Sequence, residues 1–210
     1  MRPLLLTVLC GLGALALASQ DKPGNDPPAK NGRIQGRVEL SLPGVPFRKL
    51  GPIVVYLEAL EGRLTYDVPK VVPTLTQKNA RFSPSLLVIA AGQSVRMPNQ
   101  DKILHNVFSF SRSKTFDLGL YRKGEEKTVL FSKPGVVPIY CSIHASMNAT
   151  IYVAPSPYTA IVDRAGRFSI GDVPPGRYRL GTWCQKLPAM KRTVDVRADE
   201  ATSVELIFGE

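Results

Sequence analysis

Short runs of β-branched and aromatic residues, separated by turn residues, constrain the fold of this chain most strongly. Between residues 33 and 154, clusters of Gly, Pro, Asn and Asp separate these runs, which read RIQGRVEL, PIVVYLEAL, SLLVIAAGQSVRM, HNVFSF, KTVLFS, VVPIY and ATIYVA. No stretch keeps the periodicity of an amphipathic helix. The sequence therefore predicts an all-β protein built as an antiparallel β-sandwich.

The first residues have the order of a secretory signal peptide. A basic start at Arg2 is followed by an apolar stretch and by Ala16-Leu17-Ala18, which fits a cleavage site before Ser19. The apolar stretch is shorter than the ~20 residues that cross a bilayer. We therefore expect residues 1–18 to be a signal peptide and the mature protein to be periplasmic or extracellular, without a stable membrane span.

The charge of the chain is strongly positive. Lys and Arg number 27 against 17 Asp and Glu, a formal net charge of +10, and removal of the signal peptide takes away one positive charge, Arg2. The charges are scattered and no basic run is interleaved with aromatics, so we expect no nucleic-acid partner. An excess of positive charge on an exported protein favours an acidic partner or an anionic membrane face, and general solubility is the alternative.

The sequence contains two histidines, and both lie where they could share one site with softer ligands. His144 belongs to the segment YCSIHASM together with Cys141 and Met147, and His105 lies about forty residues upstream. Two imidazoles and a thiolate with a weak axial thioether form the ligand set of a blue-copper electron-transfer site. Zinc is the rival metal, but a methionine ligand fits structural zinc sites poorly.

The cysteines leave a metal-free alternative open. Cys10 belongs to the expected signal peptide, so the mature chain keeps Cys141 and Cys184, and one disulfide is the default pairing in an oxidising compartment. That pairing would make the protein a metal-free extracellular binding or structural module. A copper carrier or chaperone, which delivers the metal, would use the same soft ligands as an electron carrier.

The segment FSPSLLVIAAGQSVRMPNQDKILHNVFS contains the elements F-x-P, A-G-x-x-V and H-N-V, and the loop of Cys141 has the short spacing C-x-x-H-x-x-M. These motifs resemble those of the cupredoxins, particularly the plastocyanin-like and amicyanin-like type 1 copper proteins. The resemblance implies a Greek-key β-sandwich that binds copper through His105, Cys141 and His144, with Met147 as the axial ligand. It also implies that Asn106 ties the two ligand loops together by hydrogen bonds.

The same resemblance implies a one-electron carrier that works with redox partner proteins and is not an enzyme. Copper enzymes such as multicopper oxidases use further histidines, and this chain has none to spare.

The remainder of the chain divides around this copper domain. Residues 19–33 are rich in Pro, Gly, Lys and Asp and are typical of a flexible linker. The copper domain is predicted over 34–155 and a second, small sandwich over 156–210. The turns D-x-x-G-x-F-x-I and PPG-x-Y in 156–210 resemble the carboxypeptidase regulatory-like family of prealbumin-type β-sandwiches. Such a domain opens with strands like those at 34–60, so the alternative is that these strands pair with the C-terminal sandwich.

Overall fold

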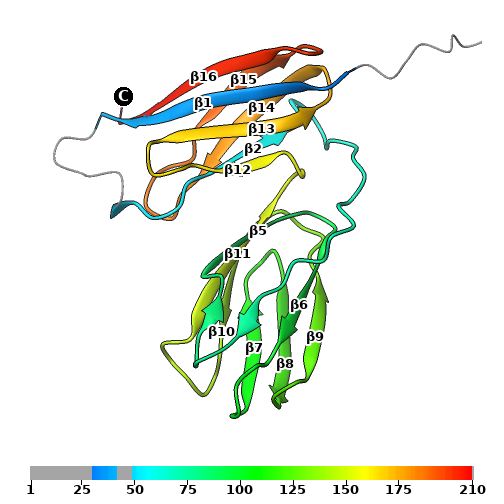
Figure 1. Ribbon diagram of the computed structural model, residues 1–210, viewed down its shortest axis with the longest axis vertical. Helices are drawn as coiled ribbons and strands as arrows, with labels where there is room; N and C mark the ends of the chain where they lie inside the picture. The colour runs from blue at the N-terminus through cyan, green and yellow to red at the C-terminus, as the bar shows by residue number, and fades with distance from the viewer. Residues whose placement is uncertain (1–29, 42–48, 210) are drawn as a thin grey trace, which may run out of the picture.

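The computed structural model describes residues 30–41 and 49–209, and in these residues it contains β-strands and no α-helix (Figure 1). The prediction of an all-β, sandwich-forming chain is confirmed. Residues 1–18 and most of the expected linker lie outside the described part. Within it, no helix has the length and apolar character that a membrane crossing requires.

The strands form two bodies stacked along the long axis (Figure 1). The body that carries the histidines, here called the first sandwich, contains a five-stranded sheet in the order β5-β11-β10-β7-β8 and a pair β6-β9. A small hairpin, β3-β4, is added at one end. The bounds are β3 Thr76–Gln77, β4 Phe82–Ser83, β5 Leu86–Ala90, β6 Ser94–Pro98, β7 His105–Phe110, β8 Thr115–Tyr121, β9 Glu126–Leu130, β10 Gly135–Tyr140 and β11 Asn148–Ala154.

The core of the first sandwich comes from alternate residues of its strands. Along β10, Val137 and Ile139 are fully buried while Val136 and Tyr140 are exposed on the other face, the period of two that a sheet imposes. These side chains pack with those of the facing strands, and Cys141 and Met147 belong to the same buried cluster. The candidate ligand loop is therefore anchored in the core of this sandwich.

The second sandwich takes strands from both ends of the chain. One sheet has the order β13-β1-β16 and the other β12-β2-β14-β15. The bounds are β1 Gly32–Leu40, β2 Val54–Glu58, β12 Thr159–Ile161, β13 Arg167–Val173, β14 Gly176–Trp183, β15 Lys191–Val196 and β16 Ala201–Phe208. β1 lies antiparallel to β13 and parallel to β16, and β2 lies between β12 and β14.

This pairing corrects the domain boundary that we placed at residue 34. The segment 34–60 supplies β1 and β2 to the second sandwich, where Ile34, Val38, Val55 and Leu57 are buried in its core. A boundary at residue 34 would cut through that core. The first sandwich is instead inserted into the second, between β2 and β12.

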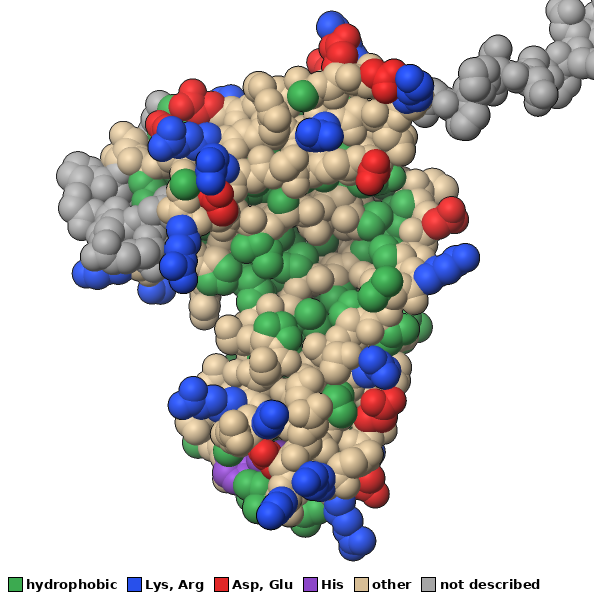
Figure 2. Space-filling view, in the orientation of Figure 1, with side chains coloured by type: hydrophobic (Ala, Val, Ile, Leu, Met, Phe, Trp, Pro, Cys, Tyr) green, Lys and Arg blue, Asp and Glu red, His purple; other side chains and the backbone are tan. Residues whose placement is uncertain are grey.

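A cluster of aromatic and aliphatic side chains joins the two sandwiches. Tyr152 at the end of β11 stacks on Trp183 of β14, with ring centroids 4.8 Å apart and planes 17° from parallel, and it also contacts Tyr56 of β2. The hydroxyl of Ser156 donates a hydrogen bond of 2.6 Å to the carbonyl of Leu57 across the same junction. Figure 2 shows hydrophobic side chains gathered on the surface between the two bodies.

Candidate metal centre

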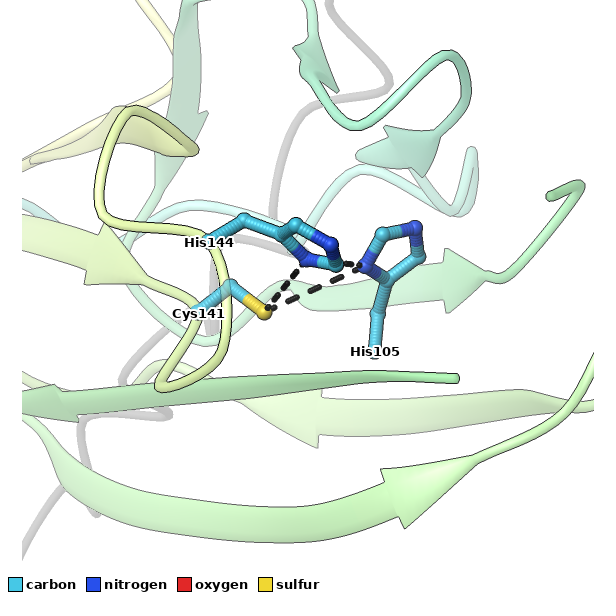
Figure 3. Close-up of side chains that lie close together, drawn as sticks. All are labelled: His105, Cys141 and His144. Carbon is cyan, nitrogen blue, oxygen red and sulfur yellow. Dashed lines mark hydrogen bonds between the residues drawn. The ribbon is translucent and has the colours of Figure 1, made fainter. Parts of the chain in front are cut away.

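His105 is the first residue of β7, a strand bounded by β10 and β8 within the five-stranded sheet. Its side chain is completely buried. A buried imidazole needs hydrogen-bonding partners, and the Nε2 atom of His105 has one in Asp101 Oδ2 at 2.8 Å. The Nδ1 atom faces the other way, toward the loop after β10 (Figure 3).

The other candidates lie on the loop that joins β10 to β11. These strands pair up to Tyr140 and Asn148, so the loop leaves and re-enters the sheet at adjacent positions. Two backbone hydrogen bonds close it, from Cys141 N–H to the carbonyl of Met147 at 3.3 Å and from Met147 N–H to the carbonyl of His144 at 2.8 Å. The loop therefore turns sharply, and it directs Cys141 and Met147 into the core.

The structure brings three of the four predicted ligands to one point (Figure 3). The two Nδ1 atoms of His105 and His144 are 3.2 Å apart. The Sγ atom of Cys141 lies 3.9 Å from Nδ1 of His105 and 3.8 Å from Nδ1 of His144. One side chain comes from β7 and two come from the β10–β11 loop, so the site depends on the fold of the whole first sandwich.

The size of this triangle fits a metal ion. The point equidistant from its three corners lies about 2.1 Å from each atom, and metal–nitrogen and metal–sulfur bonds are ~2.0–2.3 Å long. Two imidazoles, a thiolate and a thioether suit copper in both of its oxidation states, because the soft sulfurs favour Cu(I) and the imidazoles also bind Cu(II). Met147, the predicted axial ligand, is 1% exposed and packs in the same cluster as Cys141.

A buried asparagine links the two segments that carry these side chains. The Oδ1 atom of Asn106 accepts hydrogen bonds from the backbone N–H and the hydroxyl of Ser142, at 2.7 Å and 2.9 Å. Asn106 follows His105 and Ser142 follows Cys141, so the bonds hold β7 against the ligand loop. This is the contact that the cupredoxin resemblance implied for Asn106.

Sequence reasoning missed Asp101, the partner of His105. Burial raises the pKa of this carboxyl, but hydrogen bonds from Ala80, His105 and Asn79 outweigh that effect and hold the pKa below its ordinary value. An aspartate four residues before a histidine, in NQDKILH, was the available signal. This spacing alone did not predict the contact between Asp101 and His105, because the segment between them forms no regular helix or strand that would fix their distance.

The site is closed on one side and open on the other. His105, Cys141 and Met147 are buried, whereas His144 is half-buried and Ile143 next to it is exposed. Figure 2 shows a small area of exposed histidine surface toward the end farthest from the second sandwich. The site therefore meets the solvent through His144.

The Cys141–Cys184 disulfide on which the metal-free alternative rests is not formed. Both thiols are free and buried, Cys141 in the core of the first sandwich and Cys184 in the core of the second. The Sγ atom of Cys184 lies 3.7 Å from the carbonyl of Leu50. Cys184 is therefore a packing residue of the second sandwich, and the metal-free reading loses the disulfide on which it depended.

Comparisons with known proteins give matches to parts of the chain. The family model for domain II of polysaccharide lyase family 4 matches residues 145–204. A search of curated proteins gives no match. The carboxypeptidase regulatory-like resemblance of the C-terminal part stays a prediction.

The structural neighbours are cupredoxins. A purple cupredoxin from Nitrosopumilus maritimus is 24% identical with a TM-score of 0.36, covering 39% of this chain and 99% of that one. An amicyanin variant in its Cu(I) form is 16% identical with a TM-score of 0.38, covering 41% of this chain and 86% of that one. A reduced form of another amicyanin variant is 15% identical with a TM-score of 0.38, covering 47% of this chain and 97% of that one.

Proposed function

We propose that this protein is an exported type 1 copper protein that carries single electrons between redox partners and is not itself an enzyme. One observation carries the proposal: two imidazole nitrogens and a thiol sulfur meet at the spacing of a metal ion, and the loop that carries two of them also carries the buried Met147. This set is the blue-copper ligand set.

Copper, when bound, supplies a one-electron couple. The chain's own residues hold the ligand positions constant, which suits electron transfer because little rearrangement accompanies the change of charge. Asn106 ties the ligand loop to β7, and the loop is closed by its own backbone hydrogen bonds. Burial of Cys141 and Met147 excludes water from the sulfur side.

The open side of the site supports electron exchange through His144. Ile103 and Leu104 on the loop before β7 and Ile143 beside His144 have exposed fractions of 50%, 42% and 52%. Leu104 and Ile143 directly precede the two histidines in the chain, and such exposed apolar side chains offer a surface that a partner can approach without removing tightly bound water. A partner docked here would be separated from the buried ligands by one imidazole ring.

Positive charge surrounds this surface and favours an acidic partner. Three turns meet at the site end of the first sandwich, and they carry exposed cations that form no ion pair with another described residue: Lys78, Arg81, Lys102, Arg122 and Lys123. The same turns carry two carboxylates, Asp101 and Glu125, so the five cations outnumber them. A net positive field at the site raises the encounter rate with negatively charged molecules.

The proposal is tested by the visible spectrum of the purified protein with stoichiometric Cu(II). We expect an intense thiolate-to-copper band that disappears in Cys141→Ser and is unchanged in Cys184→Ser, the matched control thiol in the second sandwich. A reversible one-electron couple would then separate an electron carrier from a copper carrier, which would instead release its metal readily to a competing chelator. Absence of the band in the wild-type protein would contradict the assignment.

A further inference from the structure

The imidazole of His105 is held from behind by a carboxylate. Asp101 Oδ2 lies 2.8 Å from Nε2 of His105, and the two side chains are 13% and 0% exposed. Asp101 is four residues before His105, in the loop that enters β7. The contact is thus buried on the side of the imidazole opposite to Cys141 and His144.

The hairpin β3-β4 fixes the position of this carboxylate. Asn79 and Ala80 at its turn both have left-handed backbone angles, with φ of 55° and 50°, the conformation of a type I′ turn. The turn presents two consecutive backbone N–H groups to one carboxylate: Asn79 donates to Oδ1 at 2.6 Å and Ala80 to Oδ2 at 2.8 Å. The strands β3 and β4 have two residues each and form a two-stranded sheet of their own, so we assign the hairpin the role of holding Asp101.

A buried asparagine holds the backbone on the other side of Asp101. Asn99 is fully buried, and its Oδ1 atom accepts the N–H of Asp101 at 2.9 Å. Its Nδ2 group donates to the carbonyls of Ile103 and Tyr121, both at 2.9 Å. Asp101 is therefore positioned from two sides, by the hairpin turn and by Asn99.

The chemistry of the contact decides which nitrogen of His105 is available to a metal. An ionised carboxylate only accepts hydrogen bonds, so Nε2 of His105 must carry the hydrogen, and a neutral imidazole then has its lone pair on Nδ1. Nδ1 is the atom that faces Cys141 and His144. We propose that Asp101, set by the β3-β4 turn, is a positioning residue that holds His105 in the metal-binding tautomer and strengthens it as a ligand for Cu(II).

The effect of Asp101 on Cu(II) binding rests on the proposed copper function, whereas its effect on the tautomer of His105 does not. A hydrogen bond from a ligand imidazole to a carboxylate makes the imidazole more electron-rich, and loss of such a partner lowers metal affinity by about 10–100-fold. The added negative charge favours the more highly charged oxidation state. Asp101 therefore lowers the reduction potential relative to the same site without it.

The first test needs neither a metal nor a variant. Nitrogen-15 NMR of the metal-free wild-type protein at alkaline pH reports which ring nitrogen of His105 is protonated. We expect the hydrogen on Nε2. A His105 ring that carries its hydrogen on Nδ1 would overturn the proposal, whatever the outcome of the copper spectrum.

The second test compares Asp101→Asn with Asp163→Asn. An asparagine side chain cannot accept from both turn N–H groups and from His105 at once, because its NH2 group must face one of them. We expect the Nδ1–H tautomer of His105 to gain population and Cu(II) affinity to fall by about 10–100-fold, with a smaller loss for Cu(I). A tenfold difference between the two losses raises the reduction potential by about 59 mV.

Asp163 is the matched control, because its carboxylate also holds a turn by accepting two backbone N–H groups, from Ala165 and Arg167 at 2.8 Å, but in the second sandwich. Asp163→Asn should leave the tautomer, the affinities and the potential unchanged. Equal behaviour of the two variants, or an unchanged potential in a folded Asp101→Asn, would overturn the role of Asp101 while leaving the copper assignment intact. A wild-type protein that binds no copper would contradict the proposed function. The NMR measurement would still show whether Asp101 sets the tautomer of His105.

Discussion

Asn106 Oδ1 accepts the backbone N–H of Ser142 at 2.7 Å and its hydroxyl at 2.9 Å, which joins the strand of His105 directly to the loop of Cys141 and His144. Asn106 is 4% exposed, so the acceptor of these bonds is buried. These bonds hold the two halves of the site at their mutual distance.

We therefore expect Asn106→Ala to destabilise the metal-free protein. The backbone N–H of Ser142 would be left without its partner, at a cost of about 1–3 kcal/mol in the free energy of unfolding. Denaturant unfolding of the metal-free variant measures this directly. Asn148→Ala removes an exposed asparagine of the same loop whose amide binds the carbonyl of Ser146, and it should change stability by less than about 0.5 kcal/mol. An equal, small effect of the two changes would show that the loop is not held by Asn106.

The variant Met147→Leu distinguishes the role of Met147 as an axial ligand from its role in the packing of the core. Leucine has nearly the same volume, so we expect the fold to lose less than about 1.5 kcal/mol even though Met147 is 1% exposed. The colour should persist, because the thiolate remains, while the reduction potential rises through loss of a donor to Cu(II). Cyclic voltammetry and the visible spectrum measure the two effects. Loss of colour with retained copper would mean that Met147 does more than weakly complete the ligand set.

Much of the fold was predictable because its strands follow simple patterns. β7, β10 and β11 lie within a residue or so of the segments HNVFSF, VVPIY and ATIYVA, where β-branched and aromatic residues are bounded by turn residues. The candidate ligands were also visible, because an imidazole, a thiol and a thioether at three-residue intervals are rare and chemically specific. Rare residue types with one chemical use are the easiest to find in a sequence.

The parts that were missed depend on contacts between distant segments. The strand β8, Thr115–Tyr121, is interrupted by Asp117 and Gly119, residues that disfavour strands, and its pairing with β7 defines it. Asp101 is recognisable only once the β3-β4 turn and His105 are seen on either side of it. For 34–60 the sequence offered pairing with the C-terminal sandwich as the alternative only, because the partners β13, β14 and β16 lie more than a hundred residues away.

The cations around the site should control the rate of electron exchange with charged reagents. In the double variant Lys102→Glu, Lys123→Glu we expect oxidation of the reduced protein by ferricyanide, an anion, to slow at low salt and to lose its dependence on ionic strength. The rate of oxidation by a cationic cobalt complex should instead increase at low salt. Stopped-flow rates at several ionic strengths measure both.

Arg164→Glu is the control for this experiment, because Arg164 is an exposed arginine in a turn of the second sandwich. It reverses one charge far from the site end and should alter both rates only slightly. Equal effects of the control and of the double variant would mean that total charge, and not its place around the site, governs the encounter.

Two fragments should behave oppositely because the first sandwich is inserted into the second. A fragment of residues 64–156 keeps the whole buried cluster of the first sandwich and all four proposed ligands, and it gives up only the junction around Tyr152. A fragment of 30–156 is longer, yet it retains β1 and β2 without the strands β12–β16 with which they pair. Unpaired strand edges and uncovered apolar faces, such as that of Ile34 and Val38, promote association between chains.

We expect the shorter fragment to be monomeric and to give the same copper spectrum as the whole chain, and the longer one to aggregate. Size-exclusion chromatography and the visible spectrum with added Cu(II) distinguish these outcomes. The shorter fragment exposes Tyr152, Leu86 and Val88, which pack against the junction in the whole protein, so its thermal stability should be lower while its spectrum is unchanged. A folded 64–156 fragment that binds no copper, beside a whole chain that does, would mean that the second sandwich supplies a ligand. The position of Cys184 in the core of that sandwich, bonded to Leu50, argues against this outcome.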